Sequence, residues 1–117
     1  YFRAPQTREE THITAQLPGD LIKAGLTVAI STNYPEITIL SLIQLAGLCM
    51  KYGISYKQAM DSITINPAEI MGIQTITGSI ETGKSADIVF WNKDPFTWDA
   101  KAIGVMIRGR FAPGREL

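Results

Sequence analysis

The sequence predicts an α/β fold, and three observations lead to that class. Residues 26–31 alternate Leu, Val and Ile with Thr, Ala and Ser and carry no charge, which is typical of a strand buried on both faces of a parallel sheet. A long apolar stretch with helical spacing follows Pro35. Beyond Gly72 the chain becomes rich in threonine and isoleucine, which favours strands.

Composition narrows the class of protein. The 117 residues, 45% of them hydrophobic, suffice for one globular domain but not for two ordinary ones. Eleven basic residues balance eleven acidic ones, so no electrostatic footprint for nucleic acid is present. We see no membrane-spanning segment and no signal peptide. The single cysteine favours a cytoplasmic protein. The chain begins without methionine, which suggests a fragment or a processed product.

The first predicted element is a short helix. Residues 1–16 are polar and irregular, although Thr-Arg-Glu-Glu at 7–10 matches a capping box. A helix is predicted from Pro18 to Ala24, because proline is favoured at a helix start and Gly25 is a typical terminator.

A polar loop follows the predicted strand at residues 26–31. Residues 31–35, Ser-Thr-Asn-Tyr-Pro, place hydroxyl and amide groups just past the carboxyl end of that strand. Ligands bind at this position in α/β folds, so we take the loop as the candidate functional region.

A long helix is predicted over residues 36–52, with Gly53 as its terminator. One apolar stripe follows it at helical spacing: Ile39, Leu42, Ile43, Ala46 and Met50. Further leucines widen this surface and few charges remain, so the helix needs packing partners on more than one side. The single cysteine, Cys49, excludes a disulfide framework and a cysteine-rich zinc site, and we expect it to be a small core residue.

Two shorter helices are predicted next. Ser-Tyr-Lys-Gln at 55–58 is a capping box that opens a helix over residues 56–64. Asn66 and Pro67 form a further start signal, with the asparagine as N-cap and the proline at the first helical position. This helix is expected to span residues 67–71 and to end at the glycine that follows.

The β-rich end is predicted to contain two strands and a hairpin. Residues 81–84, Glu-Thr-Gly-Lys, predict a tight turn with glycine in the left-handed position. Strands are predicted over residues 86–91 and 102–107, and residues 108–109, Arg-Gly, are predicted to turn the chain back into residues 110–112.

Two structural roles are expected for side chains in this end. Asp87 is expected to anchor the turn at Lys84 by hydrogen bonding. Trp91, Phe96 and Trp98 could form a stacking surface, but we expect them to form an aromatic core for the β segment. The other carboxylates fall at caps, turns and helix surfaces and do not cluster.

Three stretches carry a family resemblance. They are Ala-Gly-Leu-Thr-Val-Ala-Ile at 24–30, Thr-Ile-Asn-Pro-Ala at 64–68, and Gly-Ser-Ile-Glu-Thr-Gly-Lys-Ser-Ala-Asp-Ile-Val at 78–89. Together they resemble the carboxyl-terminal end of the amidohydrolase superfamily, in its imidazolonepropionase-like or prolidase-like branch. Residues 105–110 resemble the family's final hairpin, and the likeness covers about residues 18–111.

The resemblance implies a metal-dependent hydrolase built on a (β/α)8 barrel, with a small β-sandwich made from both chain ends. Residues 1–72 would supply the last barrel strand and the helices after it. Residues 73–117 would supply the carboxyl-terminal share of the sandwich. A full barrel takes about 250 residues, so the chain resembles the end of an enzyme rather than a whole one.

The resemblance also assigns candidate site residues. In the family, an aspartate after the last strand binds metal and takes a proton from the attacking water, and Asn33 occupies that position here. An amide is uncharged and is no base at neutral pH. Either the parent is impaired, or its chemistry is arranged differently, or the alignment has slipped, or Asn33 is a turn residue beside Pro35. Tyr34 and His12 are the candidate substrate contacts, with His12 otherwise a loop residue.

No metal ligands are assigned in this chain. It has one histidine, whereas a zinc site needs three or four nitrogen, sulfur or oxygen ligands. The resemblance implies a divalent metal, zinc first, in an intact parent only.

Two functions remain open from the sequence. The first is a parent hydrolase that acts on C–N bonds of a small substrate, a cyclic amide or a dipeptide, with this chain inactive alone. The second is a non-catalytic scaffold derived from the same fold. Self-association, or pairing with a missing amino-terminal part, is expected because large uncovered apolar surfaces favour association.

Overall fold

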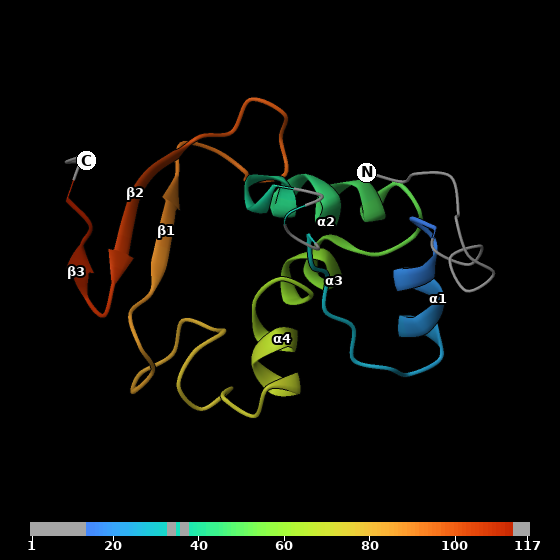
Figure 1. The fold of residues 1–117 in the computed structure, drawn as a ribbon, viewed down its shortest axis with the longest axis horizontal. Coiled ribbons are helices and arrows are strands. Elements are labelled where there is room, and N and C mark those ends of the chain that lie inside the picture. The colour runs from blue at the N-terminus through green and yellow to red at the C-terminus, as the bar shows by residue number, and fades with distance from the viewer. Residues whose placement is uncertain (1–13, 33–34, 36–37, 114–117) are drawn as a thin grey trace.

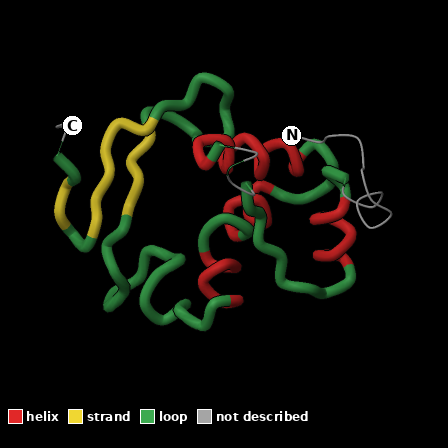
Figure 2. The backbone as a smooth tube through the Cα atoms, in the orientation of Figure 1, coloured by secondary structure: helices red, strands yellow, loops and turns green. Residues whose placement is uncertain are grey.

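The computed structural model describes residues 14–32, 35 and 38–113. Within these residues, the helices gather at one end of the molecule and a three-stranded sheet lies at the other (Figure 1). Long loops join the elements (Figure 2). The helices do not pack broadly on the sheet in the described part of the chain. Loop residues therefore join the group of helices to the sheet.

The first helix, α1, spans Leu17–Lys23. Pro18 lies in its first turn, where the missing N–H costs no hydrogen bond, and Gly25 ends it with φ at 83°. The prediction of this helix is confirmed to within one residue. The predicted capping box at residues 7–10 lies outside the described residues.

Residues 26–31 do not form the predicted strand. In the described part of the chain, no ladder joins them to another strand. Val28 and Thr32 are buried, at 9% and 8% exposed. Thr27 and Ala29 are exposed, so only one side of the segment is covered. The prediction of a strand buried on both faces is wrong for this chain, because a strand needs neighbouring strands and the sheet lies elsewhere.

The long helix predicted over residues 36–52 begins later and ends earlier. A 3-10 turn, η2 (Ile39–Ser41), leads into α2 (Leu42–Met50). Thr38 caps this turn, because its hydroxyl oxygen accepts a backbone hydrogen bond at 3.4 Å. Gly53 has φ at 103° and follows the helix as predicted.

The third helix, α3, spans Tyr56–Asp61 and opens with the predicted capping box. The Gln58 N–H donates to Ser55 Oγ at 3.2 Å, and the Ser55 N–H donates to Gln58 Oε1 at 2.8 Å. This reciprocal pair satisfies two of the donors that a helix start leaves open. The helix ends three residues before the predicted end at residue 64.

The fourth helix, α4, spans Ile65–Ile70, with Thr64 as its N-cap. Asn66 therefore lies in the first turn rather than at the predicted N-cap position. Its side chain donates to the Val28 carbonyl oxygen instead of capping the helix. Gly72 follows the helix with φ at 72°, as predicted.

The hydrophobic core lies among the helices, and three of its four buried side chains are small. Its buried members are Ala46, Cys49, Ile54 and Ala59, with Ile22, Ile30, Met50, Ile63 and Phe96 packed against them. The prediction that Cys49 is a core residue is confirmed, and burial raises the pKa of its thiol. Ile39 and Leu40 are 65% and 84% exposed, so the described residues leave the start of the long apolar helix uncovered.

The sheet contains β1 (Ile88–Trp91), β2 (Ala102–Ile107) and β3 (Arg110–Phe111), antiparallel and in that order. Arg108 and Gly109 join the last two strands with φ at 49° and 76°. Two consecutive positive φ values are typical of a type I′ hairpin. The predicted second strand and its hairpin are confirmed.

The segment between the helices and the sheet is less regular than predicted. Turns and loops occupy residues 73–87, and the first strand begins at Ile88 rather than at residue 86. The predicted tight turn is present, since the Lys84 N–H donates to the Glu81 carbonyl oxygen at 3.2 Å and Gly83 has φ at 92°.

The aromatic residues of this end do not form the predicted core. Phe96 packs against the helices, and its ring meets the Tyr56 ring edge-on with centroids 5.1 Å apart. Trp98 is 97% exposed, and Trp91 lies in β1. The prediction is wrong because the loop between β1 and β2 carries Phe96 over to the glycine at position 47, which leaves room for the ring.

Candidate functional site

The loop predicted to carry the function spans residues 31–35, and of these the structure describes Ser31, Thr32 and Pro35. Asn33, Tyr34 and His12 lie outside the described residues, so their roles stay predictions. The described residues just before this loop show how the region is held.

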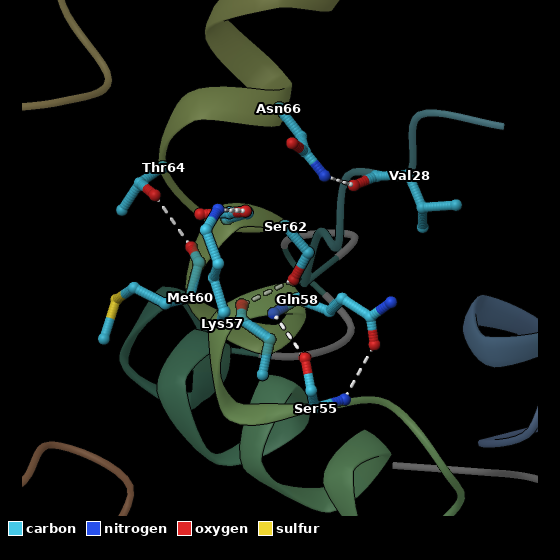
Figure 3. Close-up of polar contacts among 10 residues, drawn as sticks. Val28, Ser55, Lys57, Gln58, Met60, Ser62, Thr64 and Asn66 are labelled. Atoms are coloured by element: carbon cyan, nitrogen blue, oxygen red, sulfur yellow. Dashed lines mark hydrogen bonds and ion pairs between the residues drawn. The ribbon is translucent and has the colours of Figure 1, made fainter. Parts of the chain in front are cut away.

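Two backbone groups of residues 26–32 are bonded to residues between the end of α3 and the first turn of α4, and Figure 3 shows the first of these bonds. The Val28 carbonyl oxygen accepts a hydrogen bond from Asn66 Nδ2 at 2.8 Å. The Ile30 N–H donates to the Ser62 carbonyl oxygen at 2.9 Å. We call residues 62–66 the α3–α4 corner. Since buried backbone groups need partners, the corner takes the place that a neighbouring strand would have.

The α3–α4 corner is itself fixed by hydrogen bonds. Ser62 is fully buried, and its hydroxyl donates to the Ala59 carbonyl oxygen at 2.7 Å. The Thr64 hydroxyl donates to the Met60 carbonyl oxygen at 2.7 Å. These bonds tie the corner to the last turn of α3 and leave the Ser62 carbonyl oxygen in place for residues 26–32.

A glycine holds the other side of α4. Gly78 has φ at 99°, and a Cβ at this position would lie 2.8 Å from the Ala68 Cβ and 3.0 Å from the Ile65 Cα. Only glycine allows both this conformation and this close approach. Helix α4 is therefore held between residues 26–32 and the loop at Gly78.

Ser79, Glu81 and Lys84 form a polar cluster next to this glycine. Lys84 Nζ donates to Ser79 Oγ at 2.5 Å and to Glu81 Oε1 at 3.2 Å, and the Ser79 hydroxyl donates to Glu81 Oε1 at 2.5 Å. The bond from Ser79 and the pairing with Lys84 lower the pKa of Glu81. All three side chains of the cluster bond to one another, so the cluster fixes the turn.

Asp87 anchors a different turn from the predicted one. Its Oδ1 accepts a hydrogen bond from the Arg108 N–H at 2.8 Å, at the hairpin between β2 and β3. That bond, followed by one from the Ser85 hydroxyl, lowers the pKa of Asp87. The predicted anchoring of the Lys84 turn is wrong, because Lys84 is held by Ser79 and Glu81 instead.

Metal-binding side chains do not gather in the described part of the chain. Among residues 14–32, 35 and 38–113, no three or more His, Cys, Asp or Glu side chains lie close enough together to hold an ion. The described residues by themselves therefore do not supply the three or four ligands of the zinc site that the resemblance implies. As for membrane spans, none of the described helices is long and apolar enough to cross a bilayer.

Comparison with known proteins assigns the family. The sequence profile described as "Amidohydrolase family" matches residues 11–112. The chain belongs to the amidohydrolase family. The structure resembles the crystal structure of an amidohydrolase from Thermotoga maritima, with a TM-score of 0.88 and 31% identity over 95% of this chain.

Two amidohydrolase-family relatives show the same partial correspondence. The chain is 30% identical to "Amidohydrolase tasK" of Hapsidospora irregularis over 93% of its own length and 11% of that protein. It is 36% identical to an imidazolonepropionase of Geobacillus kaustophilus over 62% of its own length and 18% of that protein. In the Thermotoga structure it covers 29% of the chain. The chain thus spans less than a third of each of these proteins.

Sequence reasoning missed the link between Asn66 and Val28. An asparagine before proline is a local helix-start signal, and we interpreted it as an N-cap. Its partner, the Val28 carbonyl group, lies 38 residues earlier in the chain. The residues around Asn66 carry no pattern that predicts a bond over that distance. The signal that existed was the resemblance itself, which singled out residues 24–30 and 64–68, the two stretches that this bond joins.

Proposed function

We propose that this chain is the carboxyl-terminal part of an amidohydrolase that hydrolyses a C–N bond of a small substrate, a cyclic amide or a dipeptide. One observation carries the proposal: almost the whole chain superimposes on an amidohydrolase structure, at a TM-score of 0.88, while covering only 29% of it. The imidazolonepropionase among the relatives supports a cyclic amide as the first substrate class to test.

In this proposal, residues 1–72 end a (β/α)8 barrel and residues 73–117 belong to a composite β-sandwich. Residues 26–31 would be the last barrel strand. The burial pattern supports this, because Val28 and Thr32 face covered surroundings while Thr27 and Ala29 are exposed. The exposed side is the one that the rest of a barrel would cover.

Asn33 is the proposed catalytic position, with Tyr34 and His12 as proposed substrate contacts. An aspartate at this position would accept a proton, and an asparagine amide does not. We propose that a divalent metal ion of the parent, zinc first, is held mainly by residues outside this chain. The isolated chain is then inactive.

The test uses the full-length protein that contains this chain. Purified wild type is assayed for hydrolysis of cyclic amides and dipeptides, and its metal content is measured. We expect zinc-dependent hydrolysis that is weak in wild type and rises in the Asn33→Asp variant. The isolated chain serves as the control and shows no hydrolysis. Tightly bound zinc in the isolated chain, or no hydrolysis by either full-length protein, contradicts the proposal.

The second candidate function is a non-catalytic scaffold that associates with itself. It is favoured by the exposed apolar side chains of the described residues, of which Leu40 and Ile80 are 84% and 82% exposed. Light scattering of the chain between about 1 and 100 μM, a range that brackets weak association, measures its mass. A rising mass supports this function, whereas a constant monomer mass contradicts it. An unchanged activity after Asn33→Asp in the full-length protein would favour the scaffold.

A further inference from the structure

We propose that Asn66 is a positioning residue for the end of residues 26–32, the segment that leads into the candidate functional loop. The inference rests on the proposed function, because only an enzyme has a reaction to position. Its starting point is one side-chain bond, from Asn66 Nδ2 to the Val28 carbonyl oxygen at 2.8 Å (Figure 3).

The bond gives the Val28 carbonyl oxygen a side-chain donor. Val28 is 9% exposed and its bond to Asn66 is part-buried, so loss of the donor would remove a partner from a carbonyl group with restricted access to water. Two residues further on, the Ile30 N–H donates to the Ser62 carbonyl oxygen. The two bonds hold the segment at two successive points against the α3–α4 corner. Thr32 follows at 8% exposed and ends the described segment.

The asparagine can hold the segment because its own position is fixed from the opposite side. Asn66 and Ala68 are two residues apart, so they project about 200° apart around α4, given 3.6 residues per turn. On the Ala68 side, Gly78 approaches to a distance that admits no Cβ. On the Asn66 side lies Val28. Movement of helix α4 away from the segment would break the bond to Val28 and would press Ala68 against Gly78.

The experiment uses the full-length protein and three variants. Asn66→Ala removes the donor, and Asn66→Asp keeps the shape but replaces the donor by an acceptor that repels the Val28 carbonyl oxygen. Asn92→Ala is the matched control, since Asn92 Oδ1 also bonds a backbone group, the Lys101 N–H at 2.9 Å, but lies in the loop between β1 and β2.

The first measurement is amide hydrogen exchange. Both Asn66 variants are expected to speed exchange of the Ile30 amide about tenfold, because loss of one bond loosens the neighbouring one. The Ala112 amide, which donates to the Val105 carbonyl oxygen in the sheet, is the internal reference and stays unchanged. Unchanged exchange at Ile30 in both variants overturns the proposal.

The second measurement separates positioning from general stability. With substrate hydrolysis as the readout, the Asn66 variants are expected to lower kcat about tenfold and to change KM less than about twofold, because displacement of the end of residues 26–32 misplaces the reacting groups. Asn92→Ala is expected to leave both unchanged. Faster exchange at Ile30 with kcat equal to that of Asn92→Ala overturns the positioning role. If wild type hydrolyses nothing, the proposed function fails, and the exchange data still decide whether Asn66 holds the segment.

Discussion

Gly78 meets two constraints at once, a left-handed backbone conformation and direct contact with α4. Its φ of 99° is strained for any other residue, and a Cβ would lie 2.8 Å from the Ala68 Cβ. Gly83 meets only the first constraint, since its φ is 92° and nothing lies within 4 Å of its Cβ position. The two glycines therefore separate backbone strain from steric overlap.

This contrast gives the first prediction. Gly78→Ala is expected to lower the free energy of unfolding by about 2–4 kcal/mol, as the sum of strain and overpacking. Gly83→Ala is expected to lower it by about 1 kcal/mol, from strain alone. Urea unfolding of the chain measures both values. Equal losses would show that the contact with α4 is not tight.

The second prediction concerns pH. The Arg108 N–H and the Ser85 hydroxyl lower the pKa of Asp87 in the folded chain below its unfolded value of about 4. The carboxylate therefore contributes stability at neutral pH that is lost as the pH falls through the folded pKa. Asp87→Asn removes this titration, so the variant should lose less stability than wild type between about pH 5 and pH 2. Urea midpoints across that range test it, and parallel curves would contradict it.

At the scale of the element, helix starts differ in how they are capped. Ser55 makes both bonds of a capping box at the start of α3. Ser41 is the N-cap of α2 but makes no capping bond with its side chain. The two serines thus occupy the same helical position with and without the interaction.

The third prediction follows from this pair. Ser55→Ala is expected to lower the free energy of unfolding by about 1 kcal/mol, the usual effect of losing an N-cap side chain. Ser41→Ala should change it by less than about 0.5 kcal/mol. Thermal unfolding followed by circular dichroism compares them. A larger loss at Ser41 would reverse the assignment of the caps.

The distance along the chain between interacting residues explains which elements the sequence could predict. The capping box at residues 55–58 and the hairpin at Arg108 and Gly109 depend on residues adjacent in the chain, and both predictions are confirmed. The strand predicted at residues 26–31 depends on neighbouring strands that no local pattern can supply. The partner of the Asn66 side chain lies 38 residues away, so the sequence could not predict this bond either. The candidate residues Asn33, Tyr34 and His12 stay predictions.

At the scale of the whole molecule, side chains from the loop between β1 and β2 join the sheet to the helices. Phe96 packs on the core and meets the Tyr56 ring, and the Tyr56 hydroxyl donates to Asp94 Oδ1 at 3.4 Å. Trp98 comes from the same loop and is 97% exposed. The Phe96 ring thus connects the sheet to the helices, and the exposed Trp98 ring does not.

The fourth prediction tests this connection. Phe96→Ala is expected to lower the free energy of unfolding by about 2–3 kcal/mol, somewhat less than for a fully buried phenylalanine. Trp98→Ala should change it by less than about 0.5 kcal/mol, as for other exposed positions. Urea unfolding of the chain provides both numbers. A loss at Trp98 as large as that at Phe96 would show that the exposed ring has a partner in solution.

The close fit of Gly78 against α4 has an evolutionary consequence. Neither neighbour can retreat to admit a methyl group, because Ile65 contributes its main chain and Ala68 its one side-chain carbon. A bulkier residue at position 78 would require a shift of the whole six-residue helix α4. The Asn66 side-chain amide, which donates to the Val28 carbonyl oxygen, would shift with it. Selection on the loop after Thr32 would then also act on Gly78, 46 positions downstream of Thr32.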